Sequence, residues 1–386
     1  MMRFPFFPSL KNIGIKKMTI LIDLTSLADN FSGIERFAAC LSLALIKNKD
    51  NDYILLFKEA VHPMFTEYVS EPNVKSVVLP RCNKLIFNKL RLPLAIYGQR
   101  ADCYLFLAFP APVLLFKRNM ISTIHDICCW DCPETMNHAS ALYFRISHWV
   151  ALRKCTAIIT ISQFSEDRIV ERLRANRKKL WRIYCGLDQK FLNYQKNGNA
   201  ILDKYDLPGR YILSLSTLEP RKNLPLLIRA YQRLVMEDHC DIPLVLAGRK
   251  GWKMDDLLSG VPETIKNQIH FTGFVDEEDL PALYANAELF VFPSKYEGFG
   301  IPPLEALACG TRVLSSDAAS LPEVLGDAVD YFSSNNAQSL YEKMKNMVAA
   351  ETSPKQISAG KTRAKSFNWS EQAEELLNKI RSIAKK

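Results

Sequence analysis

The feature that most constrains the fold is a repeated alternation of short apolar runs with amphipathic stretches. In the first half an amphipathic stretch occupies residues 33–47, and apolar runs lie at 18–24, 53–57, 74–79, 120–124 and 156–162, with another inside 103–116. Such runs are typical of strands buried on both faces, and strands separated by helices favour a parallel, doubly wound sheet. The first half is therefore predicted to be an α/β domain.

The same alternation restarts after residues 195–210, a polar segment with two glycines and a proline that is typical of a linker. Beyond it we expect helices at 222–236, 277–287 and 303–309, and strands at 211–216, 242–248, 268–273, 287–293 and 311–316. The prediction is two Rossmann-like domains, residues 1–195 and 196–367, that face a cleft. Ligands are expected at the carboxyl ends of the strands.

The charge of the chain is unevenly distributed. Its 386 residues carry a net charge of +9, yet residues 1–190 hold 27 Lys and Arg against 16 Asp and Glu. This basic half indicates an anionic partner, such as a membrane surface, a phosphorylated substrate or nucleic acid, unless the charge serves only solubility. Because no RNA-binding or helix-turn-helix signature is present, nucleic acid is not expected as a partner.

No secretory signal or membrane span is expected. The longest uncharged run worth testing, residues 103–116, is too short for a bilayer and contains two prolines. The ten cysteines have no repeating spacing and are predicted to be free thiols. A cytoplasmic protein, or one attached peripherally to the inner face of the membrane, is the expectation.

Two carboxylates, Glu297 and Glu305, enclose the stretch GFGIPPL. Because proline fits the first turn of a helix, we expect Pro303 near a helix start and Glu305 in the first turn. Pro302 stands where a capping Ser or Thr would be, so the first amides can meet an anion, and Gly300 permits close approach. A carboxylate there can accept ribose hydroxyls. The stretch predicts a nucleotide or sugar-phosphate site, the alternative being a carboxylate that only favours the helix dipole.

A pair of cations, Arg221 and Lys222, follows the strand at 211–216 and is expected at the start of the next helix. Cations at that end oppose the helix dipole, so a diphosphate facing them would explain their position. The alternative is a pair of solvated surface charges.

The first half adds two candidate residues. Gly33 joins the first strand to its helix and allows a close approach to a ligand, and His125 directly follows the strand at 120–124. A histidine in such a loop is more often a hydrogen-bonding residue than a catalyst. Cys129 and Cys132 have the spacing of zinc ligands, but no second pair follows, so no metal site is expected.

With these residues assembled, the chain resembles the retaining glycosyltransferases of family 4, which have the GT-B fold, and in particular bacterial mannosyltransferases of surface-polysaccharide assembly. The Glu297–Glu305 pair with seven residues between is the family's hallmark. The resemblance covers nearly all of the chain beyond residue 18, and its other segments are 216–223, 244–252, 271–294, 320–328 and 367–377. It implies that a C-terminal helix, within residues 368–386, returns to the first domain.

The resemblance implies that the donor nucleotide sugar binds the second domain and the acceptor the first. As catalytic residues it implies Glu297 and His125 beside the transferred sugar, and Lys222, with Arg221, on the diphosphate. Glu305 would hold the ribose hydroxyls. The other implied donor-binding residues are Gly33, Phe274, Val275, Phe299, Gly300, Ile301 and Leu304.

The implied activity is transfer of a hexose, best guess mannose from GDP-mannose, to a glycan or lipid-linked acceptor in surface-polysaccharide synthesis. No cofactor or metal is expected, because no reliable Asp-x-Asp motif is present and residues 276–279 are interpreted as a helix start. Two alternatives are a nucleotide-sugar epimerase and a catalytically silent binding subunit of a polysaccharide assembly complex.

Two positions depart from the family pattern. Many members carry Arg where Ser216 stands, which puts more of the phosphate contact on Arg221 and Lys222. Many carry Pro where Arg312 stands, which is expected to affect only the local turn.

An anionic membrane surface is a further candidate partner. Residues 81–100 mix basic and apolar side chains in a pattern that suggests an amphipathic helix, with Pro93 expected to kink or end it. The alternative is an ordinary surface helix packed on its sheet. The basic residues are Lys84, Lys89, Arg91 and Arg100.

Overall fold

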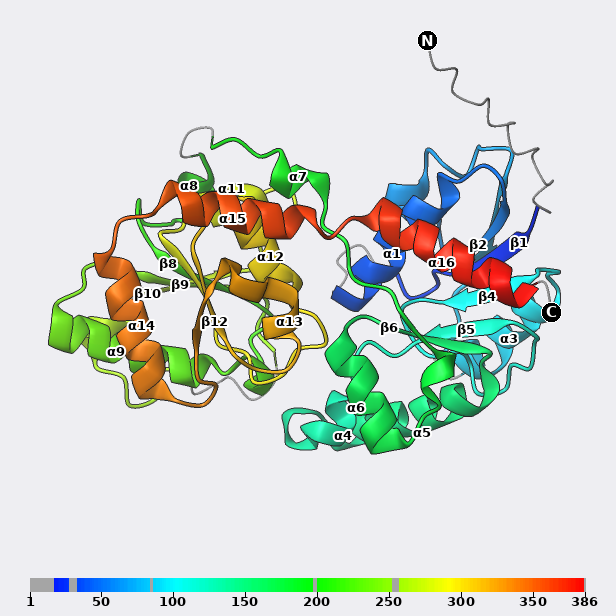
Figure 1. The fold of residues 1–386 in the computed structure, drawn as a ribbon, viewed down its shortest axis with the longest axis horizontal. Helices are drawn as coiled ribbons and strands as arrows, with labels where there is room; N and C mark the ends of the chain where they lie inside the picture. The colour runs from blue at the N-terminus through cyan, green and yellow to red at the C-terminus, as the bar shows by residue number, and fades with distance from the viewer. Residues whose placement is uncertain (1–16, 28–32, 84–85, 197–199, 252–256, 385–386) are drawn as a thin grey trace, which may run out of the picture.

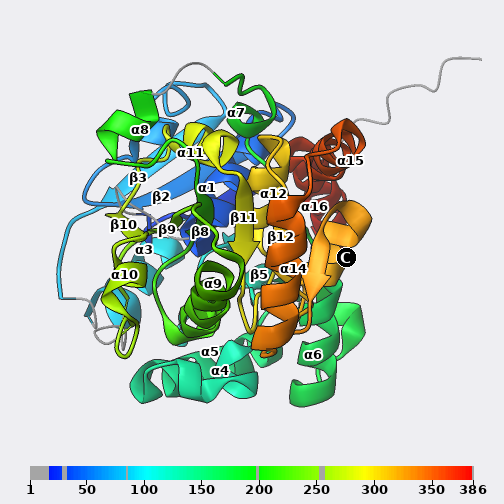
Figure 2. The same cartoon turned by 90° about the vertical axis from the view of Figure 1, so that its left-hand side faces the viewer.

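The computed structural model describes residues 17–27, 33–83, 86–196, 200–251 and 257–384, and these form two parallel sheets flanked by helices (Figures 1 and 2). In order across the first sheet, the strands are β3 (Val74–Leu79), β2 (Asp52–Lys58), β1 (Thr19–Asp23), β4 (Cys103–Phe106), β5 (Met120–Thr123), β6 (Ala157–Thr160) and β7 (Leu180–Arg182). Those of the second are β10 (Ile269–Gly273), β9 (Leu244–Ala247), β8 (Ile212–Leu215), β11 (Leu289–Phe292), β12 (Val313–Ser316) and β13 (Asp330–Phe332).

Both sheets have doubly wound topology. The strand order reverses between β1 and β4 in the first sheet and between β8 and β11 in the second. Ligands of open α/β sheets bind outside the carboxyl ends of the strands at such switch points. The predicted α/β class and the pair of Rossmann-like domains are confirmed.

Helices lie between the strands along the chain and cover both sheets (Figure 1). The first domain holds α1 (Gly33–Ile46), α3 (Leu92–Tyr97), α4 (Cys128–Asp131), α5 (His138–Lys154), α6 (Gln163–Leu173) and α7 (Gln189–Leu192). In the second domain α8 (Ala200–Lys204) precedes the sheet, and the helices after it are α9 (Leu224–Asp238), α10 (Glu263–Lys266), α11 (Leu280–Asn286), α12 (Ile301–Ala308), α13 (Leu321–Leu325), α14 (Ala337–Ala349) and α15 (Pro354–Lys365). The last helix is α16 (Trp369–Ala384). Short 3₁₀ turns lie at Pro63–Phe65, Pro133–Thr135, Arg177–Lys179, Pro220–Lys222 and Gly326–Ala328.

The strands are buried on both faces, as their apolar runs predict. Leu21 and Ile22, neighbours on β1, belong to different apolar clusters because successive side chains of a strand point to opposite faces. The cluster that contains Ile22 also contains Phe290 of β11, so apolar packing is continuous from one domain to the other. The two sheets are therefore held together by a shared core as well as by the chain.

The C-terminal helix returns to the first domain. α15 packs on α12 of the second domain, whereas α16 packs on α1, with Leu376, Leu377 and Ile380 buried (Figure 1). The expected return of the chain is thus confirmed, although the boundaries predicted after residues 195 and 367 stay predictions.

Residues 81–100 depart from the expected single helix. A π-helical turn, Phe87–Arg91, leads directly into α3, and Pro93 lies in the first turn of α3. The helical path continues through Pro93, and the wider π-helical turn directly before it lies where a proline inside a regular α-helix would clash with the preceding turn. Lys84 lies outside the described residues. None of the helices in the described ranges is long and apolar enough to cross a bilayer.

Candidate functional site

Glu297 is the buried carboxylate around which the site is built. It follows β11 and is only 7% exposed. Lys222 Nζ lies 2.6 Å from its Oε1, and Arg221 Nη1 lies 3.2 Å from its Oε2. Burial disfavours the charged carboxylate, but the two cations outweigh this and hold the pKa of Glu297 below its ordinary value. The structure thus joins three of the predicted site residues.

The two cations do not occupy the predicted helix start. They lie in the 3₁₀ turn Pro220–Lys222, and α9 begins only after Asn223, whose φ of 57° redirects the chain. Arg221 also donates to the carbonyl of Tyr296 at 3.0 Å, which anchors the loop that carries Glu297. Burial lowers the pKa of Lys222, against the opposing effect of Glu297. The cations are therefore held by Glu297 and its loop, in the turn that precedes α9.

Glu305 is more deeply buried, at 2% exposure, and lies in the second turn of α12. The expected first-turn position is wrong because α12 begins at Ile301. Arg36 Nη1 of α1 lies 2.6 Å from its Oε1, and the Tyr284 hydroxyl donates to its Oε2 at 2.9 Å. Burial raises the pKa of Glu305, while Arg36 and Tyr284 oppose that rise.

Arg36 links the two domains. Besides Glu305, Arg36 contacts the carboxylate of Glu277. Lys190 Nζ lies 3.5 Å from Oε2 of the same carboxylate. Neither Arg36 nor Tyr284 was predicted from the sequence, because they come from elements distant in the chain. The available signal was the resemblance, because Arg36 lies in SGIERF, residues 32–37, which is similar to a first-domain segment of the family, and Tyr284 lies in the resembling segment 271–294.

The start of α12 has no side-chain cap. Its N-cap is Gly300, with a φ of 101°, and a Cβ there would lie 2.6 Å from Leu321 Cδ2. Ser320 holds the preceding loop by donating to the carbonyls of Glu297 and Phe299, at 2.9 and 3.0 Å. The uncapped end of α12 and the buried Glu297 therefore lie on one loop, as the sequence predicts.

Three contacts close the domains around this loop. A Cβ on Gly298 would lie 2.7 Å from the carbonyl oxygen of His125, so glycine permits the approach. The Tyr296 hydroxyl lies 3.3 Å from Asp131 Oδ2. Glu323 accepts hydrogen bonds from the first two amides of α6, at 2.7 and 2.9 Å, where a helix dipole favours negative charge.

His125 lies at this interface, but its ring is engaged elsewhere. Nε2 lies 3.0 Å from the carbonyl oxygen of Leu107, and the ring packs edge-on against Phe37 at 5.1 Å. Burial lowers the pKa of His125 to about 4. Near neutral pH the ring is therefore uncharged, which fits the hydrogen-bonding alternative as well as a place beside a sugar.

The remaining predicted donor-binding residues are spread over both domains, and all but Gly33 lie in the second. Phe299 and Leu304 are buried in the core, whereas Ile301 lines a cavity beside Arg36 and Glu305. Phe274 is exposed after β10 with the Arg249 guanidinium 4.3 Å from its ring, and Val275 is buried. Gly33 begins α1 with open space around its Cα. No described contact joins Phe274, Val275 or Gly33 to the two carboxylates.

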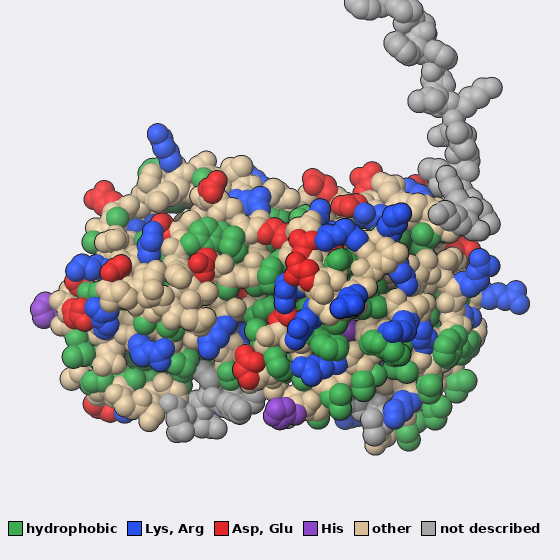
Figure 3. All heavy atoms as spheres, turned by 60° about the horizontal axis from the view of Figure 1, so that its bottom comes forward, with side chains coloured by type: hydrophobic (Ala, Val, Ile, Leu, Met, Phe, Trp, Pro, Cys, Tyr) green, Lys and Arg blue, Asp and Glu red, His purple; other side chains and the backbone are tan. Residues whose placement is uncertain are grey.

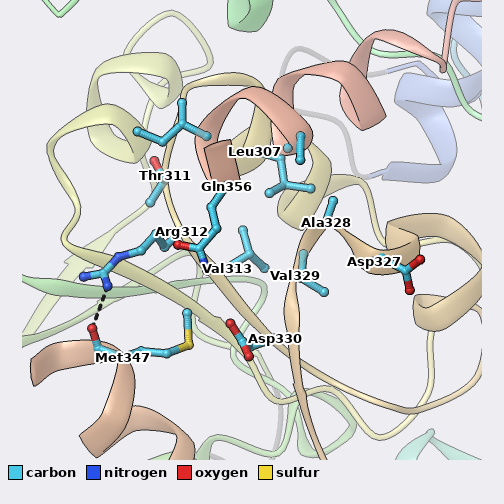
Figure 4. Close-up of a pocket in the computed structure, with 13 residues that line it drawn as sticks. Leu307, Thr311, Arg312, Val313, Asp327, Ala328, Val329, Asp330, Met347 and Gln356 are labelled. Carbon is cyan, nitrogen blue, oxygen red and sulfur yellow. Dashed lines mark hydrogen bonds between the residues drawn. The ribbon is translucent and has the colours of Figure 1, made fainter. Parts of the chain in front are cut away.

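Both departures from the family pattern have structural consequences. Ser216 is buried, and its hydroxyl has no hydrogen-bond partner among the described residues. Arg312 is also buried, and its guanidinium donates to the carbonyl of Met347 at 2.6 Å (Figure 4). It also donates to the carbonyl of Ala350, directly after α14, at 2.8 Å. The expectation that Arg312 affects only the local turn is wrong, because it ties β12 to α14 beside a cavity of about 240 Å³.

Within the described ranges, no three His, Cys, Asp or Glu side chains are grouped so that they could hold a metal ion. The charges that the site offers to an anion are those of Lys222 and Arg221, together with the start of α12.

Comparison with known proteins identifies a family and several relatives. The family Glycosyl transferases group 1 matches residues 203–363. The chain is 38% identical over 266 residues to O-antigen chain mannosyltransferase B of Escherichia coli, covering 64% of this chain and 66% of that protein, just under two thirds. It is 31% identical over 279 residues to a Campylobacter jejuni N-acetylgalactosaminyltransferase that acts on a diphospho-undecaprenol substrate, covering 69% and 72% respectively.

The chain belongs to the glycosyl transferases group 1 family. Anabaena HepE, solved in complex with UDP and glucose, matches with a TM-score of 0.69 and 16% identity over 95% of this chain and all of that one. The two parallel-sheet domains therefore have the GT-B fold.

The Arg36–Glu305 pair should contribute strongly to the stability of the domain interface. Replacing Arg36 with Met leaves a buried carboxylate without its cation, which is expected to cost about 3 kcal/mol in the free energy of unfolding measured in urea at pH 7. Adding Glu305→Gln should recover part of this loss, because the unpaired charge is removed. The pairing would be contradicted if the loss of unfolding free energy in the double variant equalled the sum of the losses in the two single variants.

Stability should fall as the pH drops from about 6.5 to about 4. The pKa of His125 is lowered to about 4, so its neutral form stabilises the fold above the unfolded-state pKa, and this contribution is lost through that window. His125→Gln should reduce the pH dependence near pH 5 by roughly 1 kcal/mol per pH unit. Urea titrations at several pH values measure this, with exposed His138→Gln as the control. An unchanged slope in His125→Gln would refute the assignment.

Proposed function

We propose that this protein is a retaining hexosyltransferase that moves mannose from GDP-mannose to a glycan or lipid-linked acceptor in surface-polysaccharide synthesis. The observation that carries the proposal is the buried Glu297, held by Lys222 and Arg221 beside the uncapped start of α12. The donor sugar is taken from a relative that is named an O-antigen mannosyltransferase.

The cations supply the electrostatic part of the reaction. When the nucleoside diphosphate leaves, negative charge grows on its β-phosphate, and fixed cations in a dry site stabilise such charge strongly. Lys222 and Arg221 pair with Glu297 in the structure, and a bound diphosphate would draw them toward itself. The amides of Gly300 and Ile301, at the start of α12, would add to this stabilisation. No metal is needed for this role.

The configuration at the anomeric carbon is retained in this mechanism because the acceptor hydroxyl attacks the same face of the sugar from which the diphosphate leaves. The bond from the anomeric carbon to the phosphate oxygen breaks, the bond to the acceptor hydroxyl oxygen forms, and the departing phosphate takes the hydroxyl proton. Glu297 lies beside the transferred sugar in this arrangement. His125, whose lowered pKa keeps it neutral near pH 7, would act as a hydrogen-bonding group.

Because the chain belongs to the glycosyl transferases group 1 family, the alternative of a nucleotide-sugar epimerase is not favoured. A catalytically silent binding subunit would draw its support from Ser216, which stands where many members carry Arg. The intact set of Glu297, Lys222 and Arg221 favours an active enzyme, since a silent subunit has no need of a buried carboxylate between two cations.

Release of nucleoside diphosphate from a panel of UDP- and GDP-sugars tests the function directly. GDP release from GDP-mannose, increased by a lipid-linked glycan acceptor and yielding an α-linked product, is the expected result. Lys222→Ala should lower turnover by roughly 10²-fold at saturating donor, because one stabilising cation is lost.

Exposed Lys355→Ala is the matched control and should leave turnover unchanged. EDTA should also change little. Full activity of Lys222→Ala, or activity abolished by EDTA and restored by a divalent metal, would contradict the proposed mechanism.

Glu305 should hold the donor ribose. Its two oxygens accept one bond each from Arg36 and Tyr284, and a carboxylate has about four acceptor positions, so two remain for the ribose hydroxyls. The cavity beside it measures about 20 Å³, room for about one water, so the ribose requires the domains to part here.

Glu305→Gln is therefore expected to weaken GDP binding by about tenfold in calorimetry, since a charge-assisted hydrogen bond is lost. Glu342→Gln, exposed on α14, is the control. Unchanged affinity in a folded Glu305→Gln protein would rule out the ribose contact.

A further inference from the structure

The exposed apolar side chains of this protein are concentrated on one part of the first domain. Of 16 exposed large hydrophobic side chains in the described chain, 12 come from three segments, 86–100, 107–119 and 138–154. We call these three segments the apolar–basic surface. They include Phe116, Leu142 and Trp149, which are 68%, 59% and 53% exposed. Patches of this kind mark interaction sites in otherwise ordinary soluble folds.

Direct contacts join the three segments into one surface. The Tyr97 hydroxyl of α3 accepts a hydrogen bond from the Phe116 amide at 2.9 Å. Lys154 of α5 donates to the carbonyl of Val113, and its Nζ lies 3.8 Å from the Phe116 ring. On the same surface Phe109 stacks on Phe144, with ring centroids 6.4 Å apart. The exposed aromatic and aliphatic groups are therefore continuous in space.

One face of α5 extends this surface along a helix. Leu142, Ile146, Trp149 and Arg153 recur at helical spacing, and the first three are exposed large hydrophobics. The guanidinium of Arg153 lies 3.5 Å from the Trp149 ring. A stripe with apolar side chains, an amphipathic aromatic ring and a terminal cation matches helices that lie in the plane of a lipid interface.

The charge of the surface has one sign. The three segments contain no Asp or Glu and eight basic residues, namely Lys89, Arg91, Arg100, Lys117, Arg118, Arg145, Arg153 and Lys154. Figure 3 shows hydrophobic side chains gathered with Lys and Arg on the half of the molecule that carries the first domain. A second copy of this chain would bring like charges face to face, which disfavours a symmetric dimer. An anionic lipid surface meets both the charge and the apolar groups.

The surface reaches the cleft. Leu107, whose carbonyl contacts His125 Nε2, begins the middle segment, and two residues later Phe109 contributes to the exposed patch. Cys129 Sγ of α4, the short helix after His125, lies 3.7 Å from His148 Nδ1 of α5. The loops that border the first-domain side of the site thus continue directly into the apolar–basic surface.

We propose that the apolar–basic surface docks this protein on an anionic lipid bilayer, with Trp149, Leu142 and Phe116 in the interface and the basic residues against the headgroups. The benefit for catalysis rests on the proposed function, because docking there would present the first-domain side of the cleft to a lipid-linked acceptor. This surface includes α5 and 107–119 and is larger than residues 81–100 alone.

Co-sedimentation with vesicles tests the docking. The full chain should bind phosphatidylglycerol vesicles at low salt, bind less at high salt, and ignore phosphatidylcholine vesicles. Leu142→Ser/Trp149→Ser should weaken binding by at least about tenfold, since two interfacial apolar groups are lost. Lys89→Gln/Arg100→Gln should weaken it by roughly fivefold for each charge removed.

The matched controls come from the second domain and should leave binding unchanged. Met236→Ser removes a side chain that is 59% exposed, and Lys355→Gln removes an exposed cation. Equal binding by the surface variants and the controls, binding that ignores salt, or no binding at all would overturn the docking surface. GDP release measured without vesicles is independent of these results, so a failure of docking is distinguishable from a failure of the proposed function.

Discussion

A carboxylate buried between two domains must find a positive charge, and this requirement organises the centre of the molecule. Glu297 and Glu305 lie on one loop-and-helix unit, yet they are neutralised from opposite sides. Glu297 is paired within its own domain by Lys222 and Arg221, whereas Glu305 is paired with Arg36 of the other domain. The first set keeps the charges of the site within the second domain, and the second pair adds a buried ionic contact between the domains to the shared apolar core.

The parts of the fold that could be predicted are those set by local pattern. The main strands were predictable because apolar runs buried on both faces are continuous, and α12 was located within two residues by its proline pair. Strands β7 and β13 were missed because each is only three residues long, too short for a repeating pattern of apolar residues to be recognised. The turn occupied by Glu305 was misplaced because Gly300, with its positive φ, caps the helix earlier than the prolines indicate.

The partners within the site were less predictable than its residues. Glu297, Lys222 and Glu305 could be named from motif and spacing, but their contacts depend on tertiary structure. Arg36 and Glu305 are 269 positions apart, and no local pattern links them. Likewise, the uneven charge was visible in the sequence, but its combination with exposed aromatic groups on α5 depends on which face of that helix packs inward.

The return of α16 has a mechanical consequence. The chain passes between the domains twice, once after β7 and once between α15 and α16, and the two passages are joined where the Leu187 amide donates to the Phe367 carbonyl at 2.9 Å. Beside them Gly186 packs so tightly on Trp369 that a Cβ would lie 2.5 Å away. Because these two joined crossings connect the domains, any parting of the domains must bend the chain there. Arg36 and Glu305 would then separate as the domains part and pair again as they close.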